Sequence, residues 1–192
     1  GSESVIPEYQ TKSFCPNNKQ FLESYWNMLS GFIKSTGVDA VMCDDASFYM
    51  GCSCDVCAQK WQEQVGGDIR KAYTESRTPG TPGWKQWNEI HRQWMHEYWR
   101  WLVNRVKQNY PGVECFGLSI SIATPWSSQV TLIPTEAVAE SADAILWEIY
   151  NPADFYSWRR TAAEAAAFTE SSRVNNYHMF ALPYADNANK RD

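Results

Sequence analysis

Hydrophobic residues recur along much of the chain at intervals of three and four, the spacing of one face of a helix. This spacing predicts a long helix that ends before Pro111 and Gly112, and an earlier one that ends at Gly37. Shorter stretches with the same spacing predict three further helices. A turn-rich link, "TPGTPG", precedes the long helix. The predicted helices cover 18–35, 58–65, 84–109, 135–140 and 153–169.

Between these helices lie short continuous apolar runs, which are typical of strands buried on both faces. The predicted strands are 38–43, 114–122, 143–149 and 176–182. Strands that alternate with helices indicate right-handed βαβ units and a parallel sheet. We therefore expect a single α/β domain over 1–192. Four strands are half of the eight in a TIM barrel, so the sheet is either a small open one or part of such a barrel.

Ligands of parallel α/β sheets bind beyond the carboxyl ends of the strands. Acidic and aromatic residues gather at those ends in this chain. They are Asp44, Asp45, Trp126, Glu148, Tyr150, Asn151 and Tyr184. Carboxylates bind sugar hydroxyls and aromatic rings stack on sugar C–H faces, so this edge suits a carbohydrate. Glu148 stands inside the apolar run "AILWEIY", where burial of an acid without a partner costs several kcal/mol.

Each of these residues also has a purely structural interpretation. Asp44 and Asp45 are typical turn formers or helix caps, and Trp126 and Tyr184 suit a core. His178 fits a structural role in the last strand as well as contact with a substrate. The aromatic residues of the long helix have the spacing of a core-facing stripe: Trp84, Trp87, Trp94, Tyr98 and Trp101. The other two histidines, five residues apart on the same helix, cannot act as a ligand pair and are expected at the surface: His91 and His96.

The cysteines form a second group of candidate residues. Cys52, Cys54 and Cys57 make a C-x-C-x-x-C motif, too closely spaced for unstrained disulfides among themselves. Thiolates that converge on a metal explain the motif more simply, and zinc prefers four ligands. The fourth is Cys15 or Cys43, and Cys15 is favoured because Cys43 continues a buried apolar run. Cys115 is expected to be a buried free thiol. The alternatives are a disulfide network in an exported protein and a redox C-x-x-C site.

Charge and hydropathy narrow the choice of partner. The net charge of −5 disfavours nucleic acid. No apolar run reaches the roughly 18 residues that span a bilayer, so no membrane partner is expected. No signal peptide opens the sequence, but Gly1-Ser2 resembles the remnant of a removed tag that can replace a native leader. The sequence therefore leaves both a cytoplasmic and an exported location open.

The segments "GVDAVMCDD" and "GCSCDVCAQKW" resemble a section of TIM-barrel glycoside hydrolases. They are similar to zinc-carrying microbial β-galactosidases, in which the acid/base carboxylate ends the fourth strand and a cysteine triplet follows, joined by one upstream cysteine. Cys15 in "FCPNNKQF" matches that upstream cysteine. The strand end also resembles that of α-L-fucosidases, in which a fourth-strand Asp is the nucleophile. Where the galactosidase pattern has Asn-Glu, this chain has Asp44 and Asp45.

The resemblance implies strands four to seven of a barrel, a half TIM barrel from a larger enzyme. It implies a two-carboxylate hydrolysis of O-glycosidic bonds, with Asp44 or Asp45 as nucleophile. We assign Glu148 as general acid/base, because its apolar surroundings in the sequence favour the raised pKa that this role needs. Substrate contacts are expected from Tyr49, Trp126, Tyr150, Asn151, His178 and Tyr184. A structural zinc ion is expected on Cys15, Cys52, Cys54 and Cys57. The alternative is a non-catalytic zinc-stabilised fragment or a carbohydrate-binding remnant.

A partial barrel leaves strand edges and apolar faces without partners. The sequence therefore also predicts a homo-oligomer, a dimer in which two four-stranded halves form one barrel-like assembly.

Overall fold

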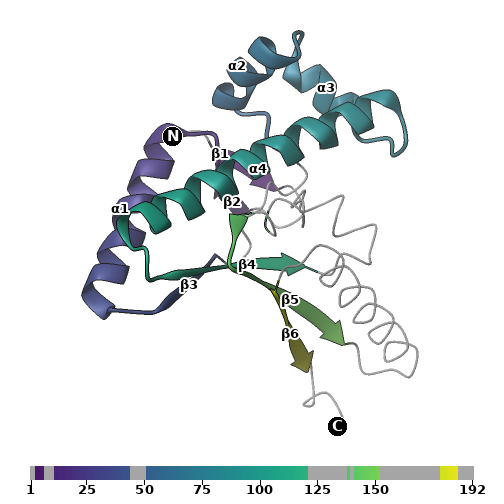
Figure 1. Cartoon of the computed structure of the whole chain (residues 1–192). Helices are drawn as coiled ribbons and strands as arrows, with labels where there is room; N and C mark the ends of the chain where they lie inside the picture. Colours follow the sequence, from purple (N-terminus) through teal and green to yellow (C-terminus); the bar gives the residue numbers. More distant parts are fainter. Residues whose placement is uncertain are drawn as a thin grey trace.

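A four-stranded parallel sheet lies beneath two long helices (Figure 1). The computed structural model describes residues 3–6, 11–43, 51–120, 138, 141–151 and 178–185, with side chains for 15–43, 51–117, 138 and 141–145. The strands are β3 (Ala40–Cys43), β4 (Glu114–Ile120), β5 (Ala144–Asn151) and β6 (His178–Ala185), and they pair in this order. All three pairings are parallel, which confirms an α/β fold.

The strand register divides the sheet into two faces. Cys43, Gly117 and Ile145 lie in one row, and this row faces the helices. Gly117 is required there, because a Cβ atom at this position would collide with Val138 and touch Trp99. The adjacent row belongs to the opposite face, as strand alternation requires. It consists of Met42, Phe116, Ala144 and His178.

Helix α1 (Lys19–Thr36) begins and ends with standard capping signals. The side chain of Asn18 accepts hydrogen bonds from the backbone N–H groups of Gln20 and Phe21. Gly37 ends the helix in the left-handed region, at φ 65°. Trp26 and Ile33 are its buried residues. The helix predicted over 18–35 is therefore confirmed.

Helix α4 (Pro82–Asn109) supplies most of the aromatic core. Its first turn is capped by the Thr81 side chain, which accepts a hydrogen bond from Trp84 N–H. Three members of the predicted stripe are buried, Trp87, Trp94 and Tyr98, whereas Trp84 and Trp101 are only partly buried. Further along the helix, Trp99, Leu102, Val103 and Val106 are buried as well.

His91 contradicts the prediction of a surface position, because its side chain is 0% exposed. The reason is visible in the spacing: His91 follows Trp87 by four residues and precedes Trp94 by three, so it belongs to the same buried face. His96, on another side of the helix, is partly exposed.

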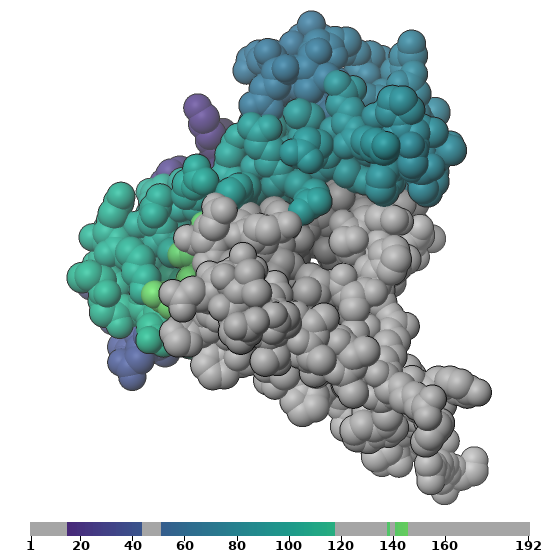
Figure 2. Space-filling view, turned by 45° about the vertical axis from the view of Figure 1, so that its right-hand side comes forward, coloured from purple at the N-terminus to yellow at the C-terminus, as the bar shows by residue number. Residues whose placement is uncertain are grey.

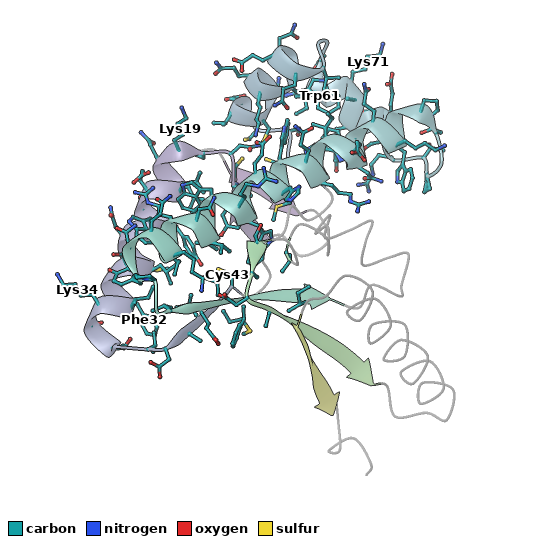
Figure 3. All side chains as sticks on the ribbon, viewed as in Figure 1. Lys19, Phe32, Lys34, Cys43, Trp61 and Lys71 are labelled. Carbon is teal, nitrogen blue, oxygen red and sulfur yellow. The ribbon has the colours of Figure 1, made fainter. Side chains whose placement is uncertain are left out.

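Two short helices pack beside the first half of α4 and form one end of the molecule, seen in blue in the space-filling view (Figure 2). They are α2 (Asp55–Gln64) and α3 (Ile69–Glu75). Trp61 of α2, labelled in Figure 3, is buried. Its ring contacts that of Trp87 of α4, with centroids 5.7 Å apart. The sequence pattern predicted α2 three residues late and did not predict α3.

The strands β1 (Glu3–Ile6) and β2 (Thr11–Phe14) form an antiparallel pair that the sequence pattern also did not predict. The helix predicted over 153–169 lies outside the described residues, and of 135–140 only Val138 is described. Among the described helices, none combines the length and the apolar character that crossing a lipid bilayer requires.

Candidate metal centre and the carboxyl end of the sheet

Four cysteine sulfurs cluster where the chain enters α1 and α2. The Sγ atoms of Cys15, Cys52, Cys54 and Cys57 all lie within 4.8 Å of one another. Those of Cys15 and Cys57 are 3.3 Å apart. Tetrahedral zinc, with Zn–S bonds of about 2.3 Å, places its sulfurs about 3.8 Å apart. The number, type and spacing of these donors therefore fit a closed four-thiolate site.

Local backbone structure brings the four sulfurs together. Cys15 opens the tight turn that leads into α1, and its carbonyl accepts a hydrogen bond from the N–H of Asn18, the N-cap of that helix. Cys54 is the N-cap of α2 and makes no side-chain capping bond, so its sulfur is available to the cluster. Cys57 lies in the first turn of α2, where the N–H groups of a helix favour negative charge. The motif spacing thus matches a loop that runs into a helix.

The thiols perturb each other's protonation strongly. Hydrogen bonds from the neighbouring thiols lower the pKa of Cys15 and Cys54. The same contacts raise the pKa of Cys52 and Cys57, which keep their protons. Burial opposes charge at all four positions. A divalent cation offsets this conflict, because thiolate is the form that binds metal and metal binding releases the protons.

A short chain of polar side chains reaches the cluster at Cys57. Asn17 Nδ2 donates a hydrogen bond to Cys57 Sγ at 3.4 Å. Lys60 Nζ in turn donates to Asn17 Oδ1 at 2.9 Å and pairs with Glu97 Oε2 at 2.5 Å. Lys60 also lies over the ring of Trp94, 5.0 Å from its centroid. Helix α4 is therefore connected to the cysteine cluster through Lys60 and Asn17.

A second connection to α4 runs through His91. Cys52 N–H lies 3.0 Å from His91 Nε2, and His91 Nδ1 lies 2.9 Å from the carbonyl oxygen of Trp87. Burial lowers the pKa of His91 to about 4, so the imidazole is neutral near pH 7. Nε2 also lies 3.1 Å from the carbonyl oxygen of Cys52. The neutral tautomer with its proton on Nδ1 makes two of these three contacts, since Nδ1–H donates to the Trp87 carbonyl and Nε2 accepts from Cys52 N–H, whereas the tautomer with its proton on Nε2 makes only the one to the Cys52 carbonyl.

The remaining two cysteines lie outside the cluster. Cys43, at the end of β3, is buried and shares a hydrogen bond of 3.0 Å with the Tyr25 hydroxyl. Cys115, at the start of β4, is buried, and desolvation raises its pKa to about 11. All six cysteines are described and none forms a disulfide. Thus Cys15, rather than Cys43, is the fourth member of the group, as the sequence predicted.

The proposed sugar-binding residues are only partly described. Asp44, Asp45, Tyr49 and Trp126 lie outside the described residues. For the others the backbone is described: Glu148, Tyr150, Asn151, His178 and Tyr184.

The register places two of the aromatic residues near the acid. Glu148 is four residues after Ala144, and Tyr150 two residues further, so both belong to the face of the sheet away from α1 and α4. Tyr150 pairs with Tyr184 of β6. Asn151 falls on the other face. His178 pairs with Ala144 at the amino end of the sheet, six residues before Tyr184.

Comparison of the sequence with models of protein families, and with curated proteins, found no match.

Three residues around the cysteine cluster were missed by the sequence reasoning. His91 carried a usable signal, because it shares the spacing of the buried aromatic stripe. Asn17 follows Cys15 by two residues, but its bond to Cys57 depends on how the chain returns 40 residues later. Nothing in the sequence distinguishes Lys60 from an ordinary exposed lysine of a helix. Its contact with Asn17 depends on the tertiary packing of α2.

Proposed function

We propose that the chain is a catalytic section of a glycoside hydrolase, a half TIM barrel that hydrolyses O-glycosidic bonds with two carboxyl groups, and that a structural zinc ion holds the loop after β3. The observation that carries the proposal is the register of the sheet. It puts Glu148, Tyr150 and Tyr184 on one face, near the carboxyl ends of parallel strands that follow one another in sequence order. This is the edge at which parallel α/β folds bind ligands.

The strand order supports a barrel over a doubly wound sheet. In a doubly wound sheet the order reverses at a switch point and helices cover both faces. Here β3, β4, β5 and β6 are neighbours in sequence order, and the described contacts of α1 and α4 are with one face. In a barrel the other face is the interior, and its carboxyl end carries the catalytic groups.

In the proposed mechanism, Asp44 or Asp45 follows β3 and acts as the nucleophile, while Glu148 in β5 acts as general acid and then base. Retaining enzymes hold the two carboxyl groups about 5 to 5.5 Å apart, and inverting enzymes about 6.5 to 9.5 Å. An acid inside an apolar strand keeps its proton more readily, which suits the general acid.

The zinc ion would have no catalytic role in this scheme. Four thiolates leave no open coordination position for water or substrate. Cys52, the first ligand of the motif, follows Asp44 by eight residues, so the metal would fix the chain at the end of the segment that begins with Asp44. A displacement of about 1 Å at a catalytic group can cost about 100-fold in rate.

The test is a panel of aryl glycosides of both anomeric configurations, assayed with this chain and with Asp44→Asn, Asp45→Asn and Glu148→Gln. We expect turnover by the wild type, loss of at least about 100-fold in Glu148→Gln and in one of the two Asp variants, and unchanged circular dichroism. Full turnover by all three variants would contradict the mechanism. Binding of the sugars without turnover by the wild type would favour the non-catalytic carbohydrate-binding alternative.

A further inference from the structure

We infer that His91 is a positioning residue for the metal centre: its imidazole Nε2 accepts the Cys52 N–H and thereby holds Cys52 in the conformation that binds metal. His91 belongs to α4 and not to the C-x-C-x-x-C motif. It is 39 residues from Cys52 in the sequence. The inference rests on the zinc ion proposed above and is independent of the glycosidase activity.

The surroundings of His91 fix the orientation of its ring. It is 0% exposed and lies between the rings of Trp87 and Trp94, with centroids 4.1 and 4.7 Å away. Its Nδ1 contacts the Trp87 carbonyl oxygen one helical turn earlier. With the ring held on both sides and Nδ1 occupied as a donor, Nε2 presents a lone pair toward the loop at a fixed position.

The loop at Cys52 needs such a partner. Cys52 precedes α2 and is outside every described helix and strand, so its buried N–H has no partner in a regular element. A buried N–H without an acceptor costs about 1 to 3 kcal/mol. Gly51, just before it, has φ 85° and lies against the indole of Trp87, where a Cβ atom would collide. Two residues of α4 therefore fix the backbone at 51–52: Trp87 packs against Gly51, and His91 accepts the Cys52 N–H.

Three substitutions of His91 distinguish the hydrogen bond of Nε2 from the packing of the ring. His91→Phe keeps an aromatic ring and removes both nitrogens. His91→Gln places an amide oxygen near the position of Nε2, whereas His91→Asn is too short to reach it. His96→Phe, on a partly exposed side of the same helix, is the matched control.

The measurement is zinc affinity by competition with a chromophoric chelator, together with the d–d absorption bands of the cobalt(II)-substituted protein. Outer contacts of metal ligands commonly contribute 10- to 100-fold to metal affinity. We expect His91→Phe and His91→Asn to bind zinc about 10- to 100-fold more weakly and to shift the cobalt bands. His91→Gln is expected within about threefold of the wild type, and His96→Phe unchanged.

The outcomes separate this inference from the proposals above. Equal zinc affinity and identical cobalt spectra in wild type, His91→Phe and His91→Asn would overturn the role of His91 and leave the zinc proposal standing. If His91→Phe does not fold, the Gln and Asn variants decide, and equal affinity in these two would overturn the inference. A wild-type chain that binds no zinc would overturn the zinc proposal and this inference together, whatever the glycoside assay gives.

Discussion

Gly51 and Gly66 have nearly the same backbone angle in different surroundings, φ 85° and 83°. At Gly66 a Cβ atom would meet nothing within 4 Å, whereas at Gly51 it would collide with the Trp87 indole. We expect Gly66→Ala to lower the free energy of unfolding by about 1 kcal/mol, the cost of the left-handed backbone. Gly51→Ala is expected to cost about 2 to 4 kcal/mol because overpacking adds to it. Urea denaturation measures both, and equal losses would contradict the described contact.

The four-cysteine cluster predicts which thiols matter for metal. Protein purified without added metal should contain about one zinc per chain by elemental analysis. Cys15→Ser should lose it, because three thiolates hold zinc more weakly and leave a position open. Cys43→Ser and Cys115→Ser should retain it, since both residues lie outside the cluster. Absence of zinc from the wild type, or its loss through Cys43→Ser alone, would contradict the assignment.

The histidine and the cysteines show what a single sequence can and cannot predict. Cys15 was predictable because a C-x-C-x-x-C motif lacks one zinc ligand and the other candidate, Cys43, continues an apolar run. The surface position predicted for His91 is wrong because its place in a buried helical stripe outweighs its polar residue type. A buried polar ring is favourable only when both nitrogens have partners, and the partner at Cys52 is set by tertiary contacts.

Asp143 joins the amino ends of two strands to α4. Its Oδ2 accepts the Cys115 N–H at 2.7 Å and pairs with Lys107 Nζ at 2.6 Å. Lys107 also donates to the carbonyl oxygen of Val113 at 2.9 Å. Burial alone would raise the pKa of Asp143, but the bonds from Lys107 and Cys115 outweigh it and hold the pKa below its ordinary 3.8.

We expect Asp143→Asn to lower the free energy of unfolding by about 1 to 2 kcal/mol near pH 7, because it removes a charge-assisted hydrogen bond. A carboxyl whose folded pKa is depressed contributes stability above about pH 4 and loses it as the pH falls through the folded pKa. The difference between wild type and Asp143→Asn should therefore shrink toward about pH 2. Denaturation of both proteins at several pH values measures the difference between their free energies of unfolding. Both proteins contain the same cysteines, so the titration of the thiols cancels in this difference. A difference that grows on acidification would contradict the described pairing.

At the level of helices and strands, long periodic segments were predictable and short ones were not. The helices α1 and α4 have strong apolar faces and clear capping residues, so their bounds agree with the pattern within two residues. Helix α3 has seven residues, with Ile69 alone buried, and β1 and β2 have four residues each. Such segments carry too few residues for a period to appear, and their structure depends on neighbours distant in sequence.

The arrangement of the described strands predicts self-association. β3 and β6 each have one neighbour among the described strands, so each presents one edge that no described strand pairs with. Met42 of β3, on the face away from the helices, is 46% exposed. We expect a dimer, with twice the chain mass of 22.0 kDa, in sedimentation at tens of micromolar protein.

Met42→Lys should weaken this dimer about tenfold or more, because a lysine charge at an apolar contact is poorly accommodated. Met28→Lys, on the exposed side of α1, is the control and should leave the dimer intact. A wild-type chain that sediments as a monomer over this range would contradict the prediction.

The position of Cys15 relative to the other three cysteines has a further consequence, for the unfolded chain. Cys15 and Cys57 are 42 residues apart, and the segment between them contains α1 and β3. A metal bound to both closes this segment into a ring, and a covalent ring of that size removes about 4 kcal/mol of chain entropy from the unfolded state. Unlike a disulfide, the closure is undone by a chelator and insensitive to mild reductants. The supply of zinc would therefore contribute to the free energy of unfolding of the segment that contains α1 and β3.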